Sequence, residues 1–164
     1  MSESPFIRLA TASEYDALGK LIFDAIHIDN AAYTDAERRA WMPAPPEGLA
    51  WAARLAVQEV WVAENDAKLV GMITLAHGGY IDFAYILAAY RGSGLFQRLY
   101  ETLETEARAQ NVDRLWSHAS LMATPALEKR GFRIVRPDPV ERDGETLMRF
   151  EVEKFLKRAE QTDV

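Results

Sequence analysis

The sequence predicts an α/β fold: a mixed, mostly antiparallel sheet with helices on both faces. Three observations lead to this fold class. Runs of β-branched and aromatic residues alternate with amphipathic helical patterns along the chain. Short turns join neighbouring strand-like runs in the middle of the sequence. A strand-like run over 80–87 also leads through two glycines directly into a strongly periodic helix.

The N-terminal part begins with a short strand over 6–10 and continues as a helix. Ser13 is the expected N-cap of this helix. Its apolar face follows helical spacing and consists of Tyr15, Leu18, Ile22, Ala25 and Ile26. The segment 30–48 is expected to be irregular and partly helical, because the proline-rich run 41–46 cannot lie inside a helix. A short helix is expected over 49–55.

The middle of the chain predicts three strands and a helix. Strands 59–63 and 68–75 are joined by an Asn65-Asp66 turn. Gly78-Gly79 is the expected two-residue turn into the strand over 80–87. After Gly94, apolar residues recur at every fourth position and indicate an amphipathic helix: Leu95, Leu99, Leu103 and Ala107.

The C-terminal part predicts a strand over 114–118, a short helix and two further strands. The short helix has Thr124 as its cap, Pro125 as its first residue and Gly131 at its end. The runs 132–135 and 146–152 alternate as half-buried strands do. The complete predicted order is β α (α α) β β β α β α β β.

Composition restricts the classes of protein. The length of 164 residues suits a single domain over 1–164. The chain has no cysteine, which excludes disulfides, thiolate metal sites and a cysteine nucleophile. The formal net charge of −6 disfavours nucleic acid as a partner and permits a neutral or cationic small substrate. Without a long apolar run or a signal-peptide pattern, no membrane partner is expected and the expected location is cytoplasmic.

The segment 91–97, which reads Arg-Gly-Ser-Gly-Leu-Phe-Gln, carries the clearest functional pattern. A strand, a glycine turn and a helix present free N–H groups and a positive dipole end that favour a phosphate. The P-loop pattern does not fit, because no Lys-Ser/Thr pair follows. The dinucleotide fingerprint does not fit either, because Phe96-Gln97 stands where its third glycine belongs. A plain strand–turn–helix connection is the alternative interpretation.

Together with the element order, Arg91-x-x-Gly94 and the later motif that runs from Ala123 to Phe132 resemble the GNAT superfamily of N-acetyltransferases. The similarity extends over roughly 6–152 and, within the superfamily, resembles a YafP-like branch. It implies a six- to seven-stranded sheet whose central strand pair splays apart. It also implies an enzyme that moves an acetyl group from acetyl-CoA to a primary amine of a small molecule or peptide. The attack would be direct, in a ternary complex, without a metal, in a monomer or homodimer.

The same resemblance implies where acetyl-CoA would bind. The pantetheine would pair with the main chain of one splayed strand. The pyrophosphate would rest on the amides of the glycine turn, and a backbone N–H near Tyr85 or Ile86 would polarise the thioester carbonyl. The residues implied in cofactor binding are Ala84, Tyr85, Ile86, Arg91, Gly92, Ser93, Gly94, Leu95, Phe96, Gln97 and Ser120.

Three positions depart from the family pattern. Phe96 replaces a small residue, and its side chain is expected to point into the core while its amide still serves. Leu127 stands where many members have a tyrosine that acts as general acid, and a leucine cannot protonate a leaving thiolate. Ser120 replaces an asparagine, with a hydroxyl that can still hydrogen-bond the cofactor.

Two residues are candidate general bases. Asp82 lies on the same face of the predicted strand as Ala84 and Ile86. Alternatively, its carboxylate hydrogen-bonds a neighbouring loop. His77 has a suitable intrinsic pKa, but a histidine beside Gly78-Gly79 is more often a solvated turn residue. His118 faces either the cofactor or the core, and the core is the favoured interpretation.

The acceptor pocket is expected within 28–55, the least patterned part of the chain. Aromatic residues there and nearby are candidates for its walls or for the core: Tyr33, Trp41, Trp51 and Tyr80. A non-catalytic acyl-CoA-binding or regulatory module is the rival function, since Leu127 lacks the catalytic hydroxyl.

Overall fold

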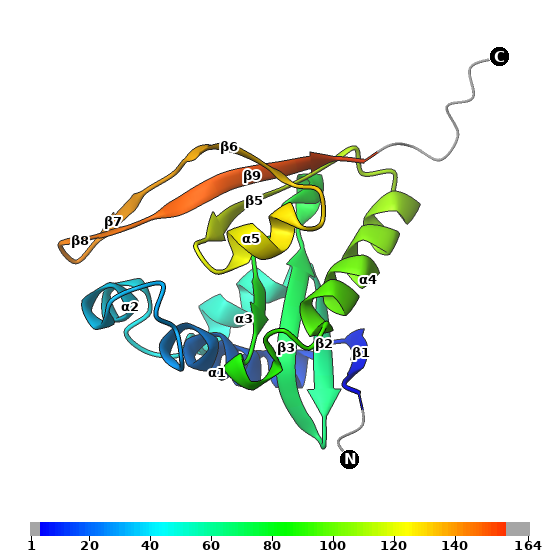
Figure 1. Cartoon of the computed structure of the whole chain (residues 1–164). Helices are drawn as coiled ribbons and strands as arrows, with labels where there is room; N and C mark the ends of the chain where they lie inside the picture. The colour runs from blue at the N-terminus through cyan, green and yellow to red at the C-terminus, as the bar shows by residue number, and fades with distance from the viewer. Residues whose placement is uncertain (1–3, 157–164) are drawn as a thin grey trace.

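An antiparallel sheet of four strands forms the first layer of the computed structural model, which describes residues 4–156 (Figure 1). Its strands lie in the order β1 (Phe6–Leu9), β2 (Glu59–Asn65), β3 (Lys68–Leu75) and β4 (Ala84–Ile86). The predicted hairpin forms, with Asp66 and Ala67 at positive φ in its turn. The strand predicted over 80–87 is shorter than expected, because a 3-10 turn, His77–Gly79, and an irregular segment precede β4.

A second sheet crosses above the first and contains β5 (Arg114–Ser120), β9 (Arg149–Phe155) and β6 (Arg133–Pro137), in that order. The strand predicted over 146–152 is in fact divided at Met148. Its first part is β8 (Glu145–Leu147), which forms a hairpin with β7 (Val140–Arg142), a strand that the sequence analysis missed. This hairpin lies against α2 (Asp35–Trp41).

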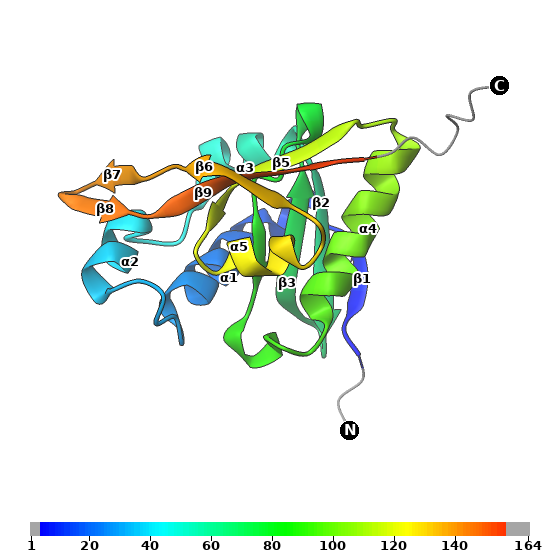
Figure 2. The same cartoon turned by 45° about the horizontal axis from the view of Figure 1, so that its top comes forward.

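Helices cover both faces of the first sheet, as predicted. The helices α1 (Tyr15–His27) and α3 (Gly48–Ala56) share one core with Val60 and Val62 of β2. On the opposite face, α4 (Leu95–Ala109) packs with Trp61 and Ala63. The strand alternates between two cores because successive side chains point to opposite faces. Figure 2 shows α5 (Ala123–Glu128) beside α4 and against the second sheet.

Two predicted helix caps are wrong. Thr11, not Ser13, begins the first helical segment, in a capping box with Glu14. Thr124 lies inside α5, where its hydroxyl donates to the Ser120 carbonyl at 2.8 Å. The Ser120 hydroxyl instead accepts the Ala123 N–H at 3.1 Å.

The two sheets meet at one point and then separate. Ile81 N–H donates to Trp116 O at 2.9 Å, and the Ser117 hydroxyl donates to Ile81 O at 2.8 Å. Beyond this contact β4 and β5 belong to different sheets. The predicted splay of the central strand pair is therefore present, and it leaves one edge of β4 without a strand partner. Within 4–156, no helix has the length and apolar character needed to cross a membrane.

Candidate active site

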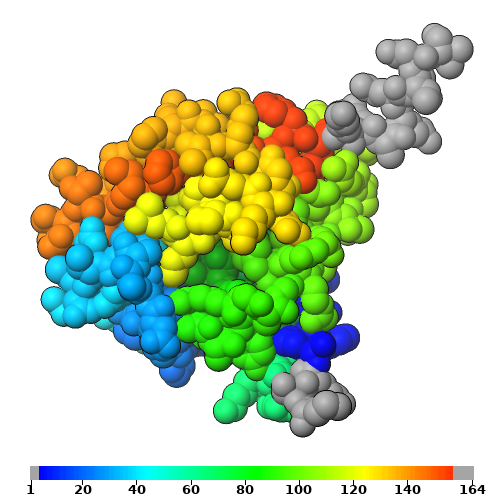
Figure 3. All heavy atoms as spheres, viewed as in Figure 1, coloured from blue at the N-terminus to red at the C-terminus, as the bar shows by residue number. Residues whose placement is uncertain are grey.

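A cavity of about 600 Å³ opens where β4 and β5 separate. Figure 3 shows it as a hollow between the yellow segment that contains α5 and the green segment that leads from β4 to α4. We call it the larger cavity. Nine residues of the implied cofactor site line it: Ala84, Tyr85, Ile86, Arg91, Gly92, Gly94, Phe96, Gln97 and Ser120.

The glycine turn forms an open surface in this cavity. Gly92 and Gly94 have φ of +76° and +89°, and a Cβ built on either would meet no atom within 4 Å. Gly94 is the N-cap of α4. Among residues 4–156, no protein acceptor takes the N–H of Phe96 or Gln97. The turn thus has the open backbone and free donors that suit a bound anion.

The edge of β4 supplies further free main-chain groups. Thr74 N–H donates to Phe83 O at 2.9 Å, and Leu87 N–H donates to Val70 O at 3.0 Å. Antiparallel pairs alternate between bonded and non-bonded positions, so Phe83, Tyr85 and Leu87 face β3. The N–H and C=O of Ala84 and Ile86 consequently point the other way, toward the separation of the two sheets.

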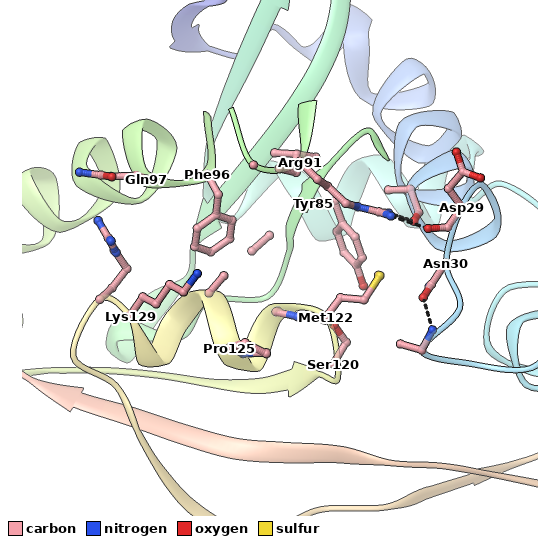
Figure 4. A pocket seen from close by; sticks show the side chains of 18 of the residues that line it. Asp29, Asn30, Tyr85, Arg91, Phe96, Gln97, Ser120, Met122, Pro125 and Lys129 are labelled. Atoms are coloured by element: carbon pink, nitrogen blue, oxygen red, sulfur yellow. Dashed lines mark hydrogen bonds between the residues drawn. The ribbon is translucent and has the colours of Figure 1, made fainter. Parts of the chain in front are cut away.

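Basic side chains surround the larger cavity. The Arg91 side chain links the glycine turn to the end of α1, donating to Ala25 O at 3.0 Å and to Asp29 O at 2.6 Å (Figure 4). Lys129 and Arg130 also line the cavity, and Figure 4 shows Lys129 on the wall opposite Arg91. The sequence analysis did not single out these two residues as ligands. Their signal was a pair of cations directly after α5, inside the second motif.

Several implied residues lie differently from expectation. The Phe96 ring lines the cavity and packs only partly against the core, so the expectation that it turns into the core is wrong in part. Leu95 is buried, and its N–H faces the Ser93 hydroxyl at 3.4 Å. Neither Ser93 nor Leu95 is among the lining residues. Leu127 is 1% exposed, belongs to the core and is not among the residues that line the cavity.

A second, smaller cavity of about 190 Å³ adjoins the first. Tyr85 and Ser120 line both cavities and therefore mark their junction. Five Phe, Tyr and Trp residues line the smaller cavity, and three of the four candidates are among them: Tyr33, Trp41 and Tyr80. The fourth, Trp51, is buried and packs edge-on against Phe83 at 5.2 Å between ring centroids.

Tyr33 connects three segments of the chain at the wall of the smaller cavity. Its hydroxyl accepts the Leu121 N–H at 2.9 Å and donates to Met148 O at 2.7 Å. Burial is the largest cause that raises the pKa of Tyr33 above its usual value, so the phenol stays protonated and can keep both bonds. The segment after α1 is thereby fixed to the ends of β5 and β8.

The candidate bases occupy three different surroundings. Asp82 lines the smaller cavity, and its carboxylate accepts from Arg54 at 2.7 and 3.0 Å and from Gln58 at 2.7 Å. His77 is exposed and lines neither cavity. His118 lines the smaller cavity, with Nδ1 2.6 Å from Oδ2 of Asp138.

Asp138 was not singled out from the sequence, because it lies in the connection after β6. Its Oδ2 is also 2.9 Å from Nε of Arg149. His118 Nδ1 and Asp138 Oδ2 are both buried, and they lie within hydrogen-bonding distance of each other without an aligned hydrogen bond. In the part of the chain that the structure describes, no group of three or more histidine or acidic side chains could hold a metal ion.

Two antiparallel sheets that meet at one point and then separate around a cavity define the fold class, and comparisons with known proteins identify the family. A family model described as an acetyltransferase (GNAT) domain matches residues 30–154. The chain belongs to the GNAT family of acetyltransferases. The resemblance inferred from the two motifs is confirmed.

A curated relative and two solved structures are similar to this chain. The uncharacterized N-acetyltransferase YafP of Escherichia coli K12 is 32% identical over 110 residues, which are 66% of this chain and 67% of YafP. A GCN5-related N-acetyltransferase from Rhodopseudomonas palustris superimposes with a TM-score of 0.85 at 25% identity, over 95% of this chain and 98% of its own. The YncA structure from Salmonella typhimurium, solved with acetyl-CoA, has a TM-score of 0.70 at 20% identity, over 98% and 99%. The latter likeness concerns the fold alone.

Proposed function

We propose that this protein transfers an acetyl group from acetyl-CoA to a primary amine of a small molecule or peptide, by direct attack in a ternary complex. The observation that carries the proposal is the pair of adjoining cavities. The larger has a glycine turn that suits a bound anion and a free strand edge, and the smaller has aromatic side chains beside titratable groups. Their junction at Tyr85 and Ser120 is where donor and acceptor would meet.

The residues of the larger cavity fit coenzyme A. Its diphosphate would lie on the amides of Phe96 and Gln97 with Arg91 nearby, and Lys129 and Arg130 suit a further phosphate. Its pantetheine amides would pair with Ala84 and Ile86. The bound thioester supplies the activated acetyl group. The register assigns the free N–H near the junction to Ile86 rather than Tyr85, so Ile86 is our candidate for polarising the carbonyl.

In this proposal His118 takes the proton from the attacking ammonium. Asp138 beside Nδ1 favours the tautomer with the proton on that nitrogen and leaves the Nε2 lone pair for the amine. Asp82 is a candidate too, although Arg54 and Gln58 already occupy its oxygens. His77 would require a relay, since it lies on neither cavity.

Tyr85 is proposed to replace the hydroxyl that Leu127 lacks. Burial is the largest cause that raises the pKa of Tyr85 well above its usual value, so the phenol stays protonated and can donate to the leaving sulfur. We expect Tyr85→Phe to lower kcat roughly 10-fold or more, as the loss of a charged hydrogen bond implies. Tyr90→Phe is the matched control, because Tyr90 bonds Asn65 outside both cavities. An unchanged kcat in Tyr85→Phe would contradict this role.

Thermal unfolding with ligands tests cofactor binding. Acetyl-CoA and CoA at saturation should each raise Tm by about 5 °C or more, whereas ATP should not. We expect Gly94→Trp to abolish the rise, because the indole would fill the open surface of the turn. Gly48→Trp is the control, with a similar φ of +86° and equally open space at the start of α3. A full rise in Gly94→Trp would place the ligand elsewhere.

Release of the CoA thiol in the presence of an amine panel distinguishes the enzyme from its rival. An enzyme releases thiol with at least one amine, whereas an acyl-CoA-binding module shows the thermal shift with no turnover.

Three further proposals have their own tests. Limited proteolysis tests a single domain over 1–164, sedimentation decides between monomer and homodimer, and cell fractionation tests the cytoplasmic location.

A further inference from the structure

The smaller cavity contains more positive than negative charge, in contrast to the whole chain. Arg54, Arg142 and Arg149 line it. Two carboxylates balance two of these guanidinium groups. The Arg54 guanidinium donates two hydrogen bonds to the two carboxylate oxygens of Asp82, and Nε of Arg149 lies 2.9 Å from Oδ2 of Asp138.

Arg142 is the guanidinium without a counter-charge. Among residues 4–156, it makes no ion pair or hydrogen bond, including with Glu145, its neighbour across the β7–β8 hairpin. It lies at the end of β7, on the hairpin that borders the smaller cavity beside α2. A guanidinium there would attract a carboxylate or similar anion and repel a second cation.

The rest of the cavity suits a small molecule with an apolar part. Trp41, Phe83 and Tyr85 contribute ring faces and edges, with centroids of Trp41 and Tyr85 6.4 Å apart. The volume of about 190 Å³ is below that of pockets for drug-sized ligands and suits a molecule of amino-acid size.

We infer that the acceptor is a small amine that also carries an anionic group, a carboxylate above all, next to an apolar or aromatic body. The anion would lie on Arg142, the apolar part against the aromatic wall, and the amine toward the junction near His118. The inference rests on the proposed acetyl transfer. It also narrows the class of acceptor, because the net charge of the chain permits neutral or cationic amines, whereas the charge at the site disfavours amines that carry a further positive charge.

The test compares aromatic and aliphatic amino acids with their amides, in which an uncharged amide group replaces the carboxylate. KM is measured at equal concentrations of neutral amine, so that the different basicities of the two amines do not decide the result. We expect the acid to have the lower KM. Arg142→Gln should raise KM for the acid roughly 10- to 100-fold and leave KM for the amide unchanged, as for a lost charged hydrogen bond. The thermal shift with CoA should stay as in the parent protein.

Arg39→Gln is the matched control. It removes the same charge from an exposed position on α2, away from both cavities, and should change neither KM. The inference is overturned if amides or diamines have the lower KM, or if Arg142→Gln leaves the ratio of acid to amide as it was.

A binding measurement separates failure of this inference from failure of the proposed function. Calorimetry on the CoA-bound protein compares each acid with its amide without any turnover. Tighter binding of the acid, lost in Arg142→Gln, supports the anion site even if no amine is acetylated, and in that case the proposed function alone is wrong. Equal binding of acid and amide overturns the inference, whatever the activity.

Discussion

Replacing His118 with alanine should lower kcat by about 100-fold or more, because a positioned general base contributes roughly 10²- to 10⁴-fold to such a reaction. The thermal shift with acetyl-CoA should be retained, since His118 lines the smaller cavity and not the larger. Steady-state kinetics with the best acceptor from the amine panel measures the effect. Added imidazole should restore part of the lost activity, which a purely structural role of His118 would not predict.

The three candidate bases are compared in the same experiment. Asp82→Asn breaks the contact with Arg54, so its Tm is measured beside its kcat. We expect a smaller loss of kcat than in His118→Ala. His77→Ala should leave both kcat and KM unchanged. If His118→Ala retains kcat while Asp82→Asn or His77→Ala loses it, His118 is not the general base. The general base is then the residue, Asp82 or His77, whose substitution lowers kcat.

The substitution Gly79→Ala should cause one of the largest losses of stability in the chain. Gly79 has φ of +79°, and a Cβ there would lie 1.9 Å from the carbonyl oxygen of Arg114 at the start of β5. The turn His77–Gly79 would have to move away from β5, and the contact of Ile81 with Trp116 would be disturbed. We expect a loss of about 3 kcal/mol or more, from left-handed strain and overpacking together, and a fall in Tm of roughly 6–12 °C.

Gly78→Ala separates these two causes. Gly78 has nearly the same φ, +75°, but its Cβ would meet no atom within 4 Å. It should therefore lose only the strain contribution of about 1–2 kcal/mol. Equal losses of Tm in the two variants would show that the approach to Arg114 relaxes without cost. A much larger loss in Gly79→Ala confirms that the close contact fixes where the two sheets meet.

The larger cavity was largely predictable from the sequence, because its chemistry belongs to the backbone. Gly92 and Gly94 permit positive φ, and the helix after them leaves its first N–H groups free wherever the domain folds. The side chains beside the turn were harder to predict. Phe96 was expected in the core, whereas its ring packs only partly against the core and also lines the cavity.

The smaller cavity was much less predictable, because its walls come from distant parts of the chain. Tyr33 contacts Met148, which lies 115 positions later in the sequence, and Asp138 contacts His118 from the connection after β6. Asp82 had the right face of a predicted strand, but Arg54 and Gln58 from the end of α3 occupy its carboxylate. A pattern along the chain contains no information about such partners.

The sequence by itself determined the order of the elements up to β6, the family motifs and the glycine turn before α4. Local periodicity, glycine positions and backbone geometry depend on neighbours within a few residues. Only the tertiary structure decided which groups face the acceptor. It placed His118 and Arg142 in one cavity with Tyr85 and left His77 outside, because the walls of this cavity, among them α2 packed against β8, come from residues far apart in the chain.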